Sequence, residues 1–443
     1  MQTARPDGFP PWTWEYWPQN QLSEDCLYLN IWVPESAKDK KLPVFVYIHG
    51  GGFTSGSGEV PLYDGEALAR RDIIVVTINY RVGVFGFLAH PELTQEAGEH
   101  PPSNFGLQDQ IAALQWIKAN IHAFGGDPNH VTIGGQSAGS YSVHYLLTSP
   151  LAKGLFQGAI AASGVPVAGT TPSLATAEKN GLAYAEALGA NSLSALRNIP
   201  ASDFIKPPKP ITNIRLQFIP NIDGKILPDD PRLLVKNGNV NDVPVLLGKT
   251  YDEGSALTPG WGVRSEQEYK SLLDRSFGSQ SDRFATLYPA IDEESRSNSS
   301  KQLLNDLGIM TLYEWSRDWT QMALSPTYMY NFVHAIPGPS QSRWAAFHSS
   351  DLTYFLDNLL VAANRDFTAE DRILAQNAAD TWANFIKFAN PNGSNGRSWP
   401  SFDIKNPQLQ QFGDGSPVVP FLSDEKKAAF EQYQASGGKT AVF

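Results

Sequence analysis

Residues 131–139 constrain the fold of this chain more than any other segment. The β-branched run Val131-Thr132-Ile133 leads into Gly135-Gln136-Ser137-Ala138-Gly139, and residues 141–147 have the pattern of a helix. A strand, a sharp turn with a serine at its apex and a helix together form a nucleophile elbow. Small residues are needed there because the strand and the helix pass close to each other. We therefore predict that Ser137 stands clear of the backbone as a nucleophile.

A second motif follows another predicted strand. Residues 42–48 form a continuous apolar run, as expected of a parallel strand buried on both faces, and His49-Gly50-Gly51-Gly52-Phe53 comes next. Successive glycines can turn backbone N–H groups toward an oxygen that becomes negative during a reaction. Together with the N–H of Ala138, Gly51 and Gly52 would form an oxyanion hole. A phosphate loop would need a following Lys-Ser/Thr or a Rossmann spacing, and the segment has neither.

The order of these two motifs predicts an α/β-hydrolase fold, with a central, mostly parallel, twisted sheet flanked by helices. Further strands are predicted at residues 73–80, 130–133, 158–163, 243–248, 327–333 and 408–412. Helices are predicted at residues 104–124, 369–388 and 423–434. Residues 165–220, rich in Pro and Ser, predict a helical excursion from the sheet. We expect residues 1–443 to form a single domain that includes this excursion.

Charge and composition exclude several classes of protein. The net charge of -11 and the pI near 5.2 argue against a nucleic-acid-binding protein, and no basic cluster opposes this. No apolar run reaches the roughly 18 residues of a membrane-spanning helix. Cys26 is the only cysteine, so an intrachain disulfide and a zinc site of several thiolates are excluded. We expect no metal site and see no secretory signal.

The base that activates Ser137 should follow it in the chain, because this fold orders its triad as serine, acid, histidine. Five of the eight histidines precede Ser137, and His144 lies within the predicted elbow helix. We expect structural roles for these six. His334, at the end of a predicted strand, and His348, in the loop 345–351, remain as candidates. The residues alone leave this choice open.

The acid that orients the base has two main candidates. Asp252 and Glu253 directly follow the predicted strand 243–248, where a carboxylate could hold an imidazole. The carboxylates of the segment 223–230 are rivals, but Asp223-Gly224 and Asp230-Pro231 are more typical of turns. The residues alone leave this choice open as well.

Several motifs resemble those of the type-B carboxylesterase/lipase family, which includes cholinesterases, p-nitrobenzyl esterases, fungal lipases and the non-catalytic neuroligins. They are Glu24-Asp25-Cys26-Leu27-Tyr28-Leu29-Asn30, the glycine loop 49–53, Asn79-Tyr80-Arg81, Phe124-Gly125-Gly126-Asp127-Pro128, the elbow, the segment 248–254 and Phe347-His348. The resemblance covers nearly the whole chain. It implies an esterase in which Glu253 is the acid, His348 the base, and Gly51, Gly52 and Ala138 the oxyanion donors. It implies no cofactor.

The chain also departs from the family pattern. Members usually have a longer segment with a small antiparallel sheet before the Glu-Asp-Cys-Leu motif, whereas only 23 residues precede Glu24 here. We therefore expect a shortened N-terminal region. The usual disulfide partner of Cys26 is missing, so we expect a buried free thiol. Secretion is favoured over a cytoplasmic location, because many members of the family are secreted and the chain has two glycosylation sequons. These are Asn298-Ser299-Ser300 and Asn392-Gly393-Ser394.

Four residues are expected in the substrate pocket. Gln136 replaces the glutamate of cholinesterases, Trp17 lies near the place of their choline-binding tryptophan, Phe53 ends the glycine loop, and Thr170 falls by simple count at their acyl-pocket tryptophan. Trp17 could equally pack a loop onto the body of the protein.

These replacements favour a broad carboxylesterase that prefers neutral esters and has an acyl side roomy enough for bulky acyl groups. A lipase, a feruloyl esterase or a mycotoxin esterase would use the same triad. The rival class is a non-catalytic binding protein on the same scaffold, but such proteins lose the serine. We expect a monomer or a homodimer.

Overall fold

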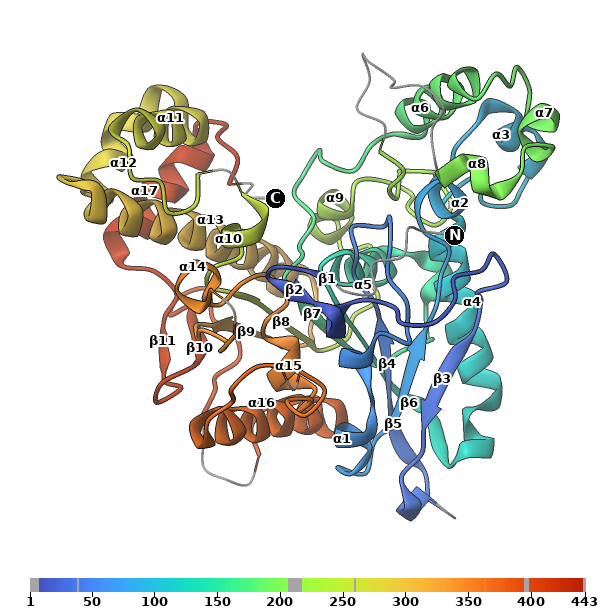
Figure 1. The fold of residues 1–443 in the computed structure, drawn as a ribbon, viewed down its shortest axis with the longest axis horizontal. Helices are drawn as coiled ribbons and strands as arrows, with labels where there is room; N and C mark the ends of the chain where they lie inside the picture. Colours follow the sequence, from blue (N-terminus) through green and yellow to red (C-terminus); the bar gives the residue numbers. More distant parts are fainter. Residues whose placement is uncertain are drawn as a thin grey trace.

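A nine-stranded sheet forms the centre of the molecule in this computed structural model, which describes residues 8–37, 40–205, 217–258, 260–338, 340–362, 364–393 and 398–440. The strand order is β11-β10-β9-β8-β7-β6-β4-β5-β3 (Figure 1). The bounds are β3 Leu29–Trp32, β4 Leu42–Ile48, β5 Ile74–Ile78, β6 Gly126–Gln136, β7 Gly158–Ala162, β8 Val245–Thr250, β9 Thr327–Phe332, β10 Gln408–Phe412 and β11 Val418–Pro420. The strands are parallel except at the two edges, where β3 pairs with β5 and β11 with β10 in antiparallel fashion.

Strand β4 divides its side chains between two hydrophobic cores. In β4, Val44 and Val46 belong to one core, whereas Phe45 and Tyr47 belong to the other, and all four are almost completely buried. Side chains alternate between the faces of a strand, so a strand covered on both faces must be apolar throughout. This confirms the burial predicted from the apolar run.

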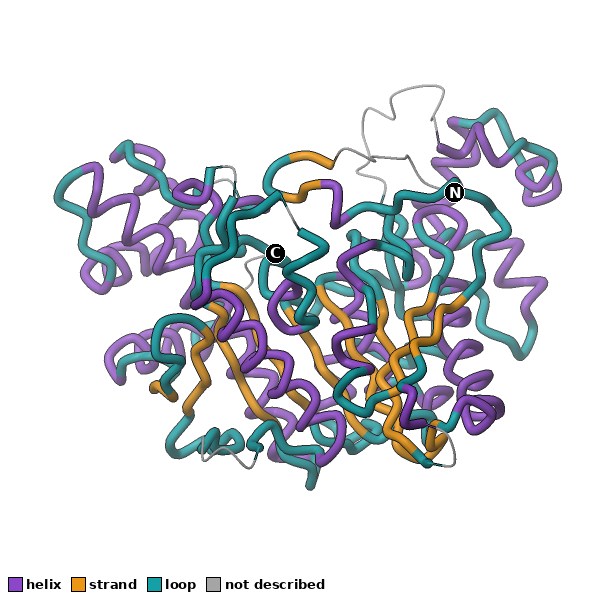
Figure 2. The backbone as a smooth tube through the Cα atoms, turned by 60° about the horizontal axis from the view of Figure 1, so that its bottom comes forward, coloured by secondary structure: helices purple, strands orange, loops and turns teal. Residues whose placement is uncertain are grey.

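Helices cover both faces of the sheet (Figure 2). One core includes side chains from α4 (Phe105–Asn120), α5 (Ala138–Thr148) and α13 (Glu293–Met322). The other includes side chains from α15 (Leu352–Phe355) and α16 (Ala369–Phe388). The predicted mostly parallel sheet flanked by helices is therefore confirmed.

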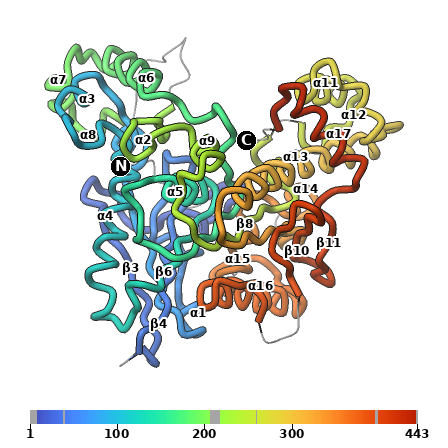
Figure 3. Tube along the Cα trace, turned by 180° about the vertical axis from the view of Figure 1, so that it is seen from behind, coloured from blue at the N-terminus to red at the C-terminus, as the bar shows by residue number. Residues whose placement is uncertain are grey.

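Two groups of helices lie beyond the sheet layers (Figures 1 and 3). Within the predicted excursion 165–220 lie α6 (Leu174–Ala187), α7 (Leu193–Arg197) and α8 (Ala201–Ile205), while residues 206–216 are outside the described residues. An ion pair of 2.7 Å between Arg197 and Glu96 ties α7 to α3 (Pro91–Ala97). The second group contains α11 (Glu266–Phe277), α12 (Ser281–Leu287) and α17 (Asp424–Ala435). The single domain stays a prediction.

The element predictions succeeded where the local signal was strong. The predicted helix 369–388 and strand 408–412 have the bounds of α16 and β10. The predictions missed the 30-residue helix α13. Serines fill much of its first turns, and serine is a weaker helix former than alanine or leucine.

The N-terminal region contains a small antiparallel sheet of β1 (Gly8–Phe9) and β2 (Trp12–Thr13). Cys26 is half-buried rather than buried, because the segment that carries it runs along the surface. Among the helices of the described residues, none combines the length and the apolar character that crossing a membrane requires.

Candidate active site

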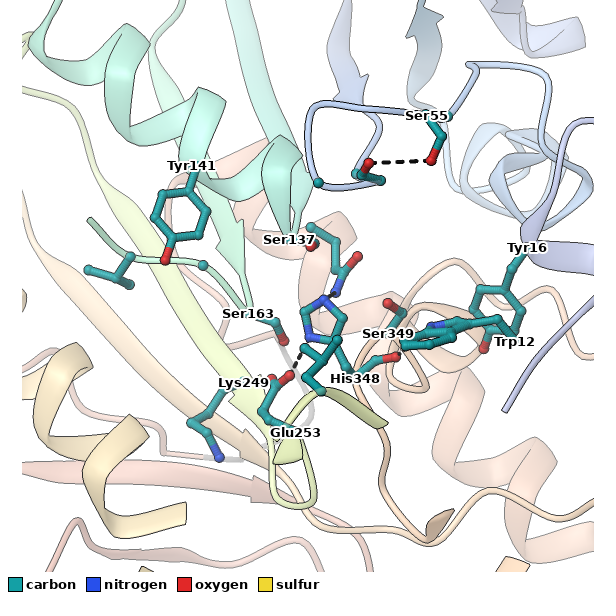
Figure 4. Close-up of a pocket in the computed structure, with 18 of the residues that line it drawn as sticks. Trp12, Tyr16, Ser55, Ser137, Tyr141, Ser163, Lys249, Glu253, His348 and Ser349 are labelled. Carbon is teal, nitrogen blue, oxygen red and sulfur yellow. Dashed lines mark hydrogen bonds and ion pairs between the residues drawn. The ribbon is translucent and has the colours of Figure 1, made fainter. Parts of the chain in front are cut away.

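The predicted site residues meet at one edge of the sheet. Gly51 and Gly52 follow β4, Ser137 follows β6, and Glu253 follows β8, while His348 lies in the loop between α14 (Gln341–Trp344) and α15. Parallel strands that are neighbours end at the same edge, so residues far apart in sequence converge there. All five residues line one cavity of about 350 Å³. Figure 4 shows Ser137, His348 and Glu253 close together in this cavity.

Ser137 occupies a strained turn between β6 and α5. Its φ of 58° and ψ of -124° are rare for a residue with a side chain. The glycines on either side permit this turn: a Cβ on Gly135 would lie 2.4 Å from the carbonyl carbon of Gly139, and a Cβ on Gly139 would lie 2.0 Å from the carbonyl oxygen of Ile48. The Gly-x-Ser-x-Gly pattern is therefore a steric requirement of this turn.

His348 and Glu253 form a buried pair. Nδ1 of His348 bonds Oε2 of Glu253, and the two side chains are 9% and 4% exposed. The other carboxylate oxygen, Oε1, accepts a hydrogen bond of 2.9 Å from the N–H of Thr250. Burial by itself would raise the pKa of Glu253, but the charge and hydrogen bond of His348, helped by Lys249, lower it to about 2. Glu253 is thus ionised at neutral pH.

The neighbouring carboxylate, Asp252, has a different partner. Its side-chain Oδ2 accepts from the N–H of Ala346 at 3.1 Å, and its own N–H donates to the carbonyl of Ala346 at 3.0 Å. Asp252 thereby fastens the loop after β8 to the loop that carries His348. The geometry favours Glu253 as the orienting acid.

The alternative base, His334, belongs to another place in the fold. Its Nε2 lies 2.7 Å from Oδ1 of Asp371, and both residues line a second cavity with Gln341 and Thr368. His348, by contrast, lines the cavity that contains Ser137. The geometry favours His348 as the base.

The glycine loop has the conformation that only glycine adopts readily. Gly51 and Gly52 have φ values of 106° and 62°. The hydroxyl of Tyr80 donates to the carbonyl of His49 at 2.8 Å and holds the start of the loop. Ala138, the first residue of α5, presents its N–H at a helix N-terminus, where negative charge is stabilised. The convergence of these three N–H groups on one oxygen stays a prediction.

Gln136 contacts the candidate base, which the sequence analysis did not anticipate. Its amide Nε2 lies 3.1 Å from Nε2 of His348. Because Nδ1 of His348 donates to Glu253, Nε2 accepts from the amide. In the described structure Ser137 makes no hydrogen bond with this nitrogen. The nitrogen that would take the proton of Ser137 is therefore hydrogen-bonded to Gln136, the residue that precedes Ser137.

The predicted pocket residues divide into two pairs. Trp17 and Gln136 line the cavity. Phe53 instead packs into the core, with its ring centroid 5.2 Å from that of Phe87. Thr170 is exposed, and its hydroxyl donates to the carbonyl of Val167 at 2.7 Å. Thr170 is not among the residues that line the cavity, because counting residues through a loop assumes an unchanged path.

Other lining residues were missed. Val165 and Val167 line the cavity after β7, and aromatic side chains line it elsewhere: Phe9, Trp12, Tyr16, Tyr63 and Tyr141. The sequence does contain a signal for Trp12, because it lies close to Trp14 and Trp17 in the chain. The other aromatic residues come from segments whose relative placement depends on the whole fold.

Lys249 is an unexpected buried cation in the same cavity. Its ammonium donates to Oδ1 of Asn305 at 2.8 Å and to the carbonyl of Thr250. Burial lowers its pKa to about 8, although Glu253 and Asp252 oppose this shift. Among the described residues there is no group of three or more His, Cys, Asp or Glu side chains placed to hold a metal ion.

Comparisons with known proteins agree with this geometry. The sequence profile of the carboxylesterase family matches residues 4–430. The chain is 36% identical to a fumonisin B1 esterase of Sphingopyxis macrogoltabida, over 88% of this chain and 73% of that protein. It is 37% identical to a para-nitrobenzyl esterase of Bacillus subtilis (strain 168), over 86% and 77%. A solved PNB esterase structure superposes with a TM-score of 0.76 at 34% identity, over 92% of this chain and 85% of that one.

Proposed function

This chain belongs to the carboxylesterase family, and we propose that it hydrolyses carboxylic esters with Ser137 as nucleophile, His348 as general base and Glu253 as orienting acid. The chain is a carboxylic ester hydrolase by its family and its named relatives. The observation that carries the assignment of residues is the buried His348–Glu253 pair, which shares one cavity with a serine on a strained elbow.

The reaction would proceed in two stages. Nε2 of His348 takes the proton of Ser137 while Oγ attacks the ester carbonyl, and the carboxylate of Glu253 stabilises the imidazolium. His348 then gives the proton to the leaving alcohol. Water, activated by the same nitrogen, next attacks the acyl-enzyme and releases the acid.

The negative oxygen of each tetrahedral intermediate would be held by backbone N–H groups of Gly51, Gly52 and Ala138. One such donor contributes about 3–4 kcal/mol to the stability of the transition state. No step requires a group other than these protein atoms, the ester and water.

The cavity favours neutral esters. Its walls are largely aromatic and aliphatic, and the amide of Gln136 stands beside His348 where an acidic side chain would attract cations. The charged groups of Lys249 and Glu253 already have partners within the protein.

Two relatives of similar identity are named for different esters, fumonisin B1 and para-nitrobenzyl, so the resemblance supports the class of ester hydrolases and not one substrate.

The test combines a probe with substrates. The protein and its Ser137→Ala variant are treated with a fluorophosphonate and mapped by peptide mass, and p-nitrophenyl esters of increasing chain length are assayed. We expect one adduct, on Ser137, and hydrolysis that the variant lacks. Hydrolysis that persists in Ser137→Ala, or an adduct elsewhere, would overturn the assignment.

A further inference from the structure

We propose that residues 9–18, called here the N-terminal clamp, hold the loop of His348 in place, and that Trp12 is a positioning residue for the reaction. This rests on the proposed function of His348 as base. The indole Nε1–H of Trp12 donates to the backbone carbonyl of His348 itself, at 3.0 Å. The two residues are 336 positions apart in the chain. Figure 4 shows the Trp12 ring beside Ser349 and His348.

The clamp is anchored by a buried ion pair. Nε of Arg365 lies 3.1 Å from Oε1 of Glu15, and the two side chains are 4% and 0% exposed. The same guanidinium donates to the carbonyl of Pro11 at 3.1 Å and to the hydroxyl of Thr13 at 3.0 Å. One arginine therefore fastens the residues on both sides of Trp12, and a planar fork of donors suits such a role.

Aromatic packing holds the residue that precedes His348. The ring of Phe347 lies 6.3 Å from that of Trp12 and 6.0 Å from that of Tyr16 between centroids. The guanidinium of Arg365 lies 5.6 Å from the centroid of the same ring. Phe347 thus contacts both the clamp and its anchor, while Glu253 holds the imidazole of His348 from another side.

The same clamp residues form a wall of the cavity: Phe9, Trp12, Tyr16, Trp17 and Pro18. In the proposed reaction His348 gives its proton to the leaving alcohol, so that step depends on the position of the His348 loop. A small displacement of a catalytic group lowers the rate without changing how well the ground state binds. Loosening the clamp should therefore lower kcat rather than raise KM.

Trp12→Phe tests this, because it keeps a ring and removes the one N–H. The matched control is Trp14→Phe, which changes an exposed tryptophan of the same segment that does not line the cavity. With p-nitrophenyl acetate we expect Trp12→Phe to lower kcat about fivefold, as loss of a hydrogen bond of about 1 kcal/mol would. KM should stay within about twofold, and Trp14→Phe should match the parent chain in both parameters.

Other results would overturn the proposal. Unchanged kcat, or a raised KM with unchanged kcat, would make Trp12 a wall residue only. An equal loss in Trp14→Phe would show a general effect of the segment. Thermal midpoints are measured for each variant, and if Trp12→Phe fails to fold, Tyr16→Leu replaces it. That variant removes the ring that packs 6.0 Å from Phe347, and an unchanged kcat there would contradict the clamp.

The same variants distinguish a failure of the proposed function from a failure of the clamp. If Ser137→Ala still hydrolyses the ester, the triad assignment is wrong whatever Trp12→Phe does. If Ser137→Ala is inactive and Trp12→Phe has the parent kcat, only the clamp is refuted.

Discussion

Two histidines that follow β9 in the chain each contact a carboxylate, and the two pairs differ in what surrounds them. His348 bonds Glu253 in a cavity that also holds Ser137. His334 lies 2.7 Å from Asp371, but Asp371 also accepts hydrogen bonds from Tyr354 and from Thr368 at the start of α16. The histidine side chains are 9% and 22% exposed, respectively.

The comparison shows that such a pair is only an orienting device. A carboxylate fixes an imidazole in both places, yet only the His348 pair shares its cavity with a serine on an elbow and a glycine loop. The Asp371 carboxylate closes a capping box with Thr368, which satisfies N–H groups at the beginning of a helix. The second pair therefore belongs to the start of α16, whereas the first lies where the proton transfer that we propose would occur.

The largest expected difference concerns the histidines themselves. His348→Gln removes the proposed base and should lower kcat/KM for p-nitrophenyl acetate by about 10⁴-fold or more. His334→Gln changes a pair outside the cavity and should leave kcat/KM within about twofold. Initial rates of both variants, at matched protein concentration, check this. A comparable loss in His334→Gln would mean that the two pairs have been assigned to the wrong roles.

The carboxylates should separate activity from stability. Glu253→Gln keeps the size of the side chain but loses the charge that stabilises the imidazolium, so kcat should fall about 10³- to 10⁴-fold. Asp371→Asn weakens the capping box and should lower the free energy of unfolding by about 1–2 kcal/mol while hydrolysis persists. Urea unfolding and ester hydrolysis are measured on both. A loss of activity in folded Asp371→Asn would contradict the comparison.

The contrast also shows what the sequence could predict. The elbow and the glycine loop follow from residues adjacent in the chain, and the capping box at Thr368 and Asp371 marks the start of α16. The residues alone could not choose between Asp252 and Glu253, or between His334 and His348. That choice depends on the bridge between Asp252 and Phe347, which joins two loops distant in sequence. The resemblance to a family supplied the choice that local patterns could not.

Long-range packing explains the other failures. No residue near Trp12 in the sequence indicates that its indole N–H bonds a carbonyl 336 positions away. Thr170 was placed by counting, although the turn at Val167 directs it to solvent. The helix α13 was not predicted, because its first turns are polar and most of its buried side chains lie farther along the helix.

Acid should weaken both pairs. Burial raises the pKa of Glu253, but His348 and then Lys249 lower it to about 2. Burial also raises the pKa of Asp371, but its hydrogen bonds lower that pKa below its usual value. The donors of these hydrogen bonds are Tyr354, Thr368 and His334. The unfolded chain then binds more protons than the folded one, so stability rises with pH. The contribution of Glu253 is complete above pH 4.5 and is lost as the pH falls toward 2. Between pH 5 and 2.5 the free energy of unfolding should fall less steeply in Glu253→Gln than in the parent chain; equal slopes would contradict the lowered pKa.

The smallest expected effect concerns the contact that the His348 pair has and the His334 pair lacks. The amide of Gln136 donates to Nε2 of His348, so it competes with the hydroxyl of Ser137 for that nitrogen. Gln136→Met removes the donor and keeps a side chain of similar length. A hydrogen bond of about 1 kcal/mol corresponds to a factor of about five. The second-order rate constant for inactivation of Gln136→Met by a small fluorophosphonate should therefore rise up to about fivefold. His334→Gln should have the same rate constant as the parent chain. A slower reaction of Gln136→Met would mean that the amide holds His348 in its productive position instead of withholding it. Gln136 would then belong with Trp12 among the groups that position the base.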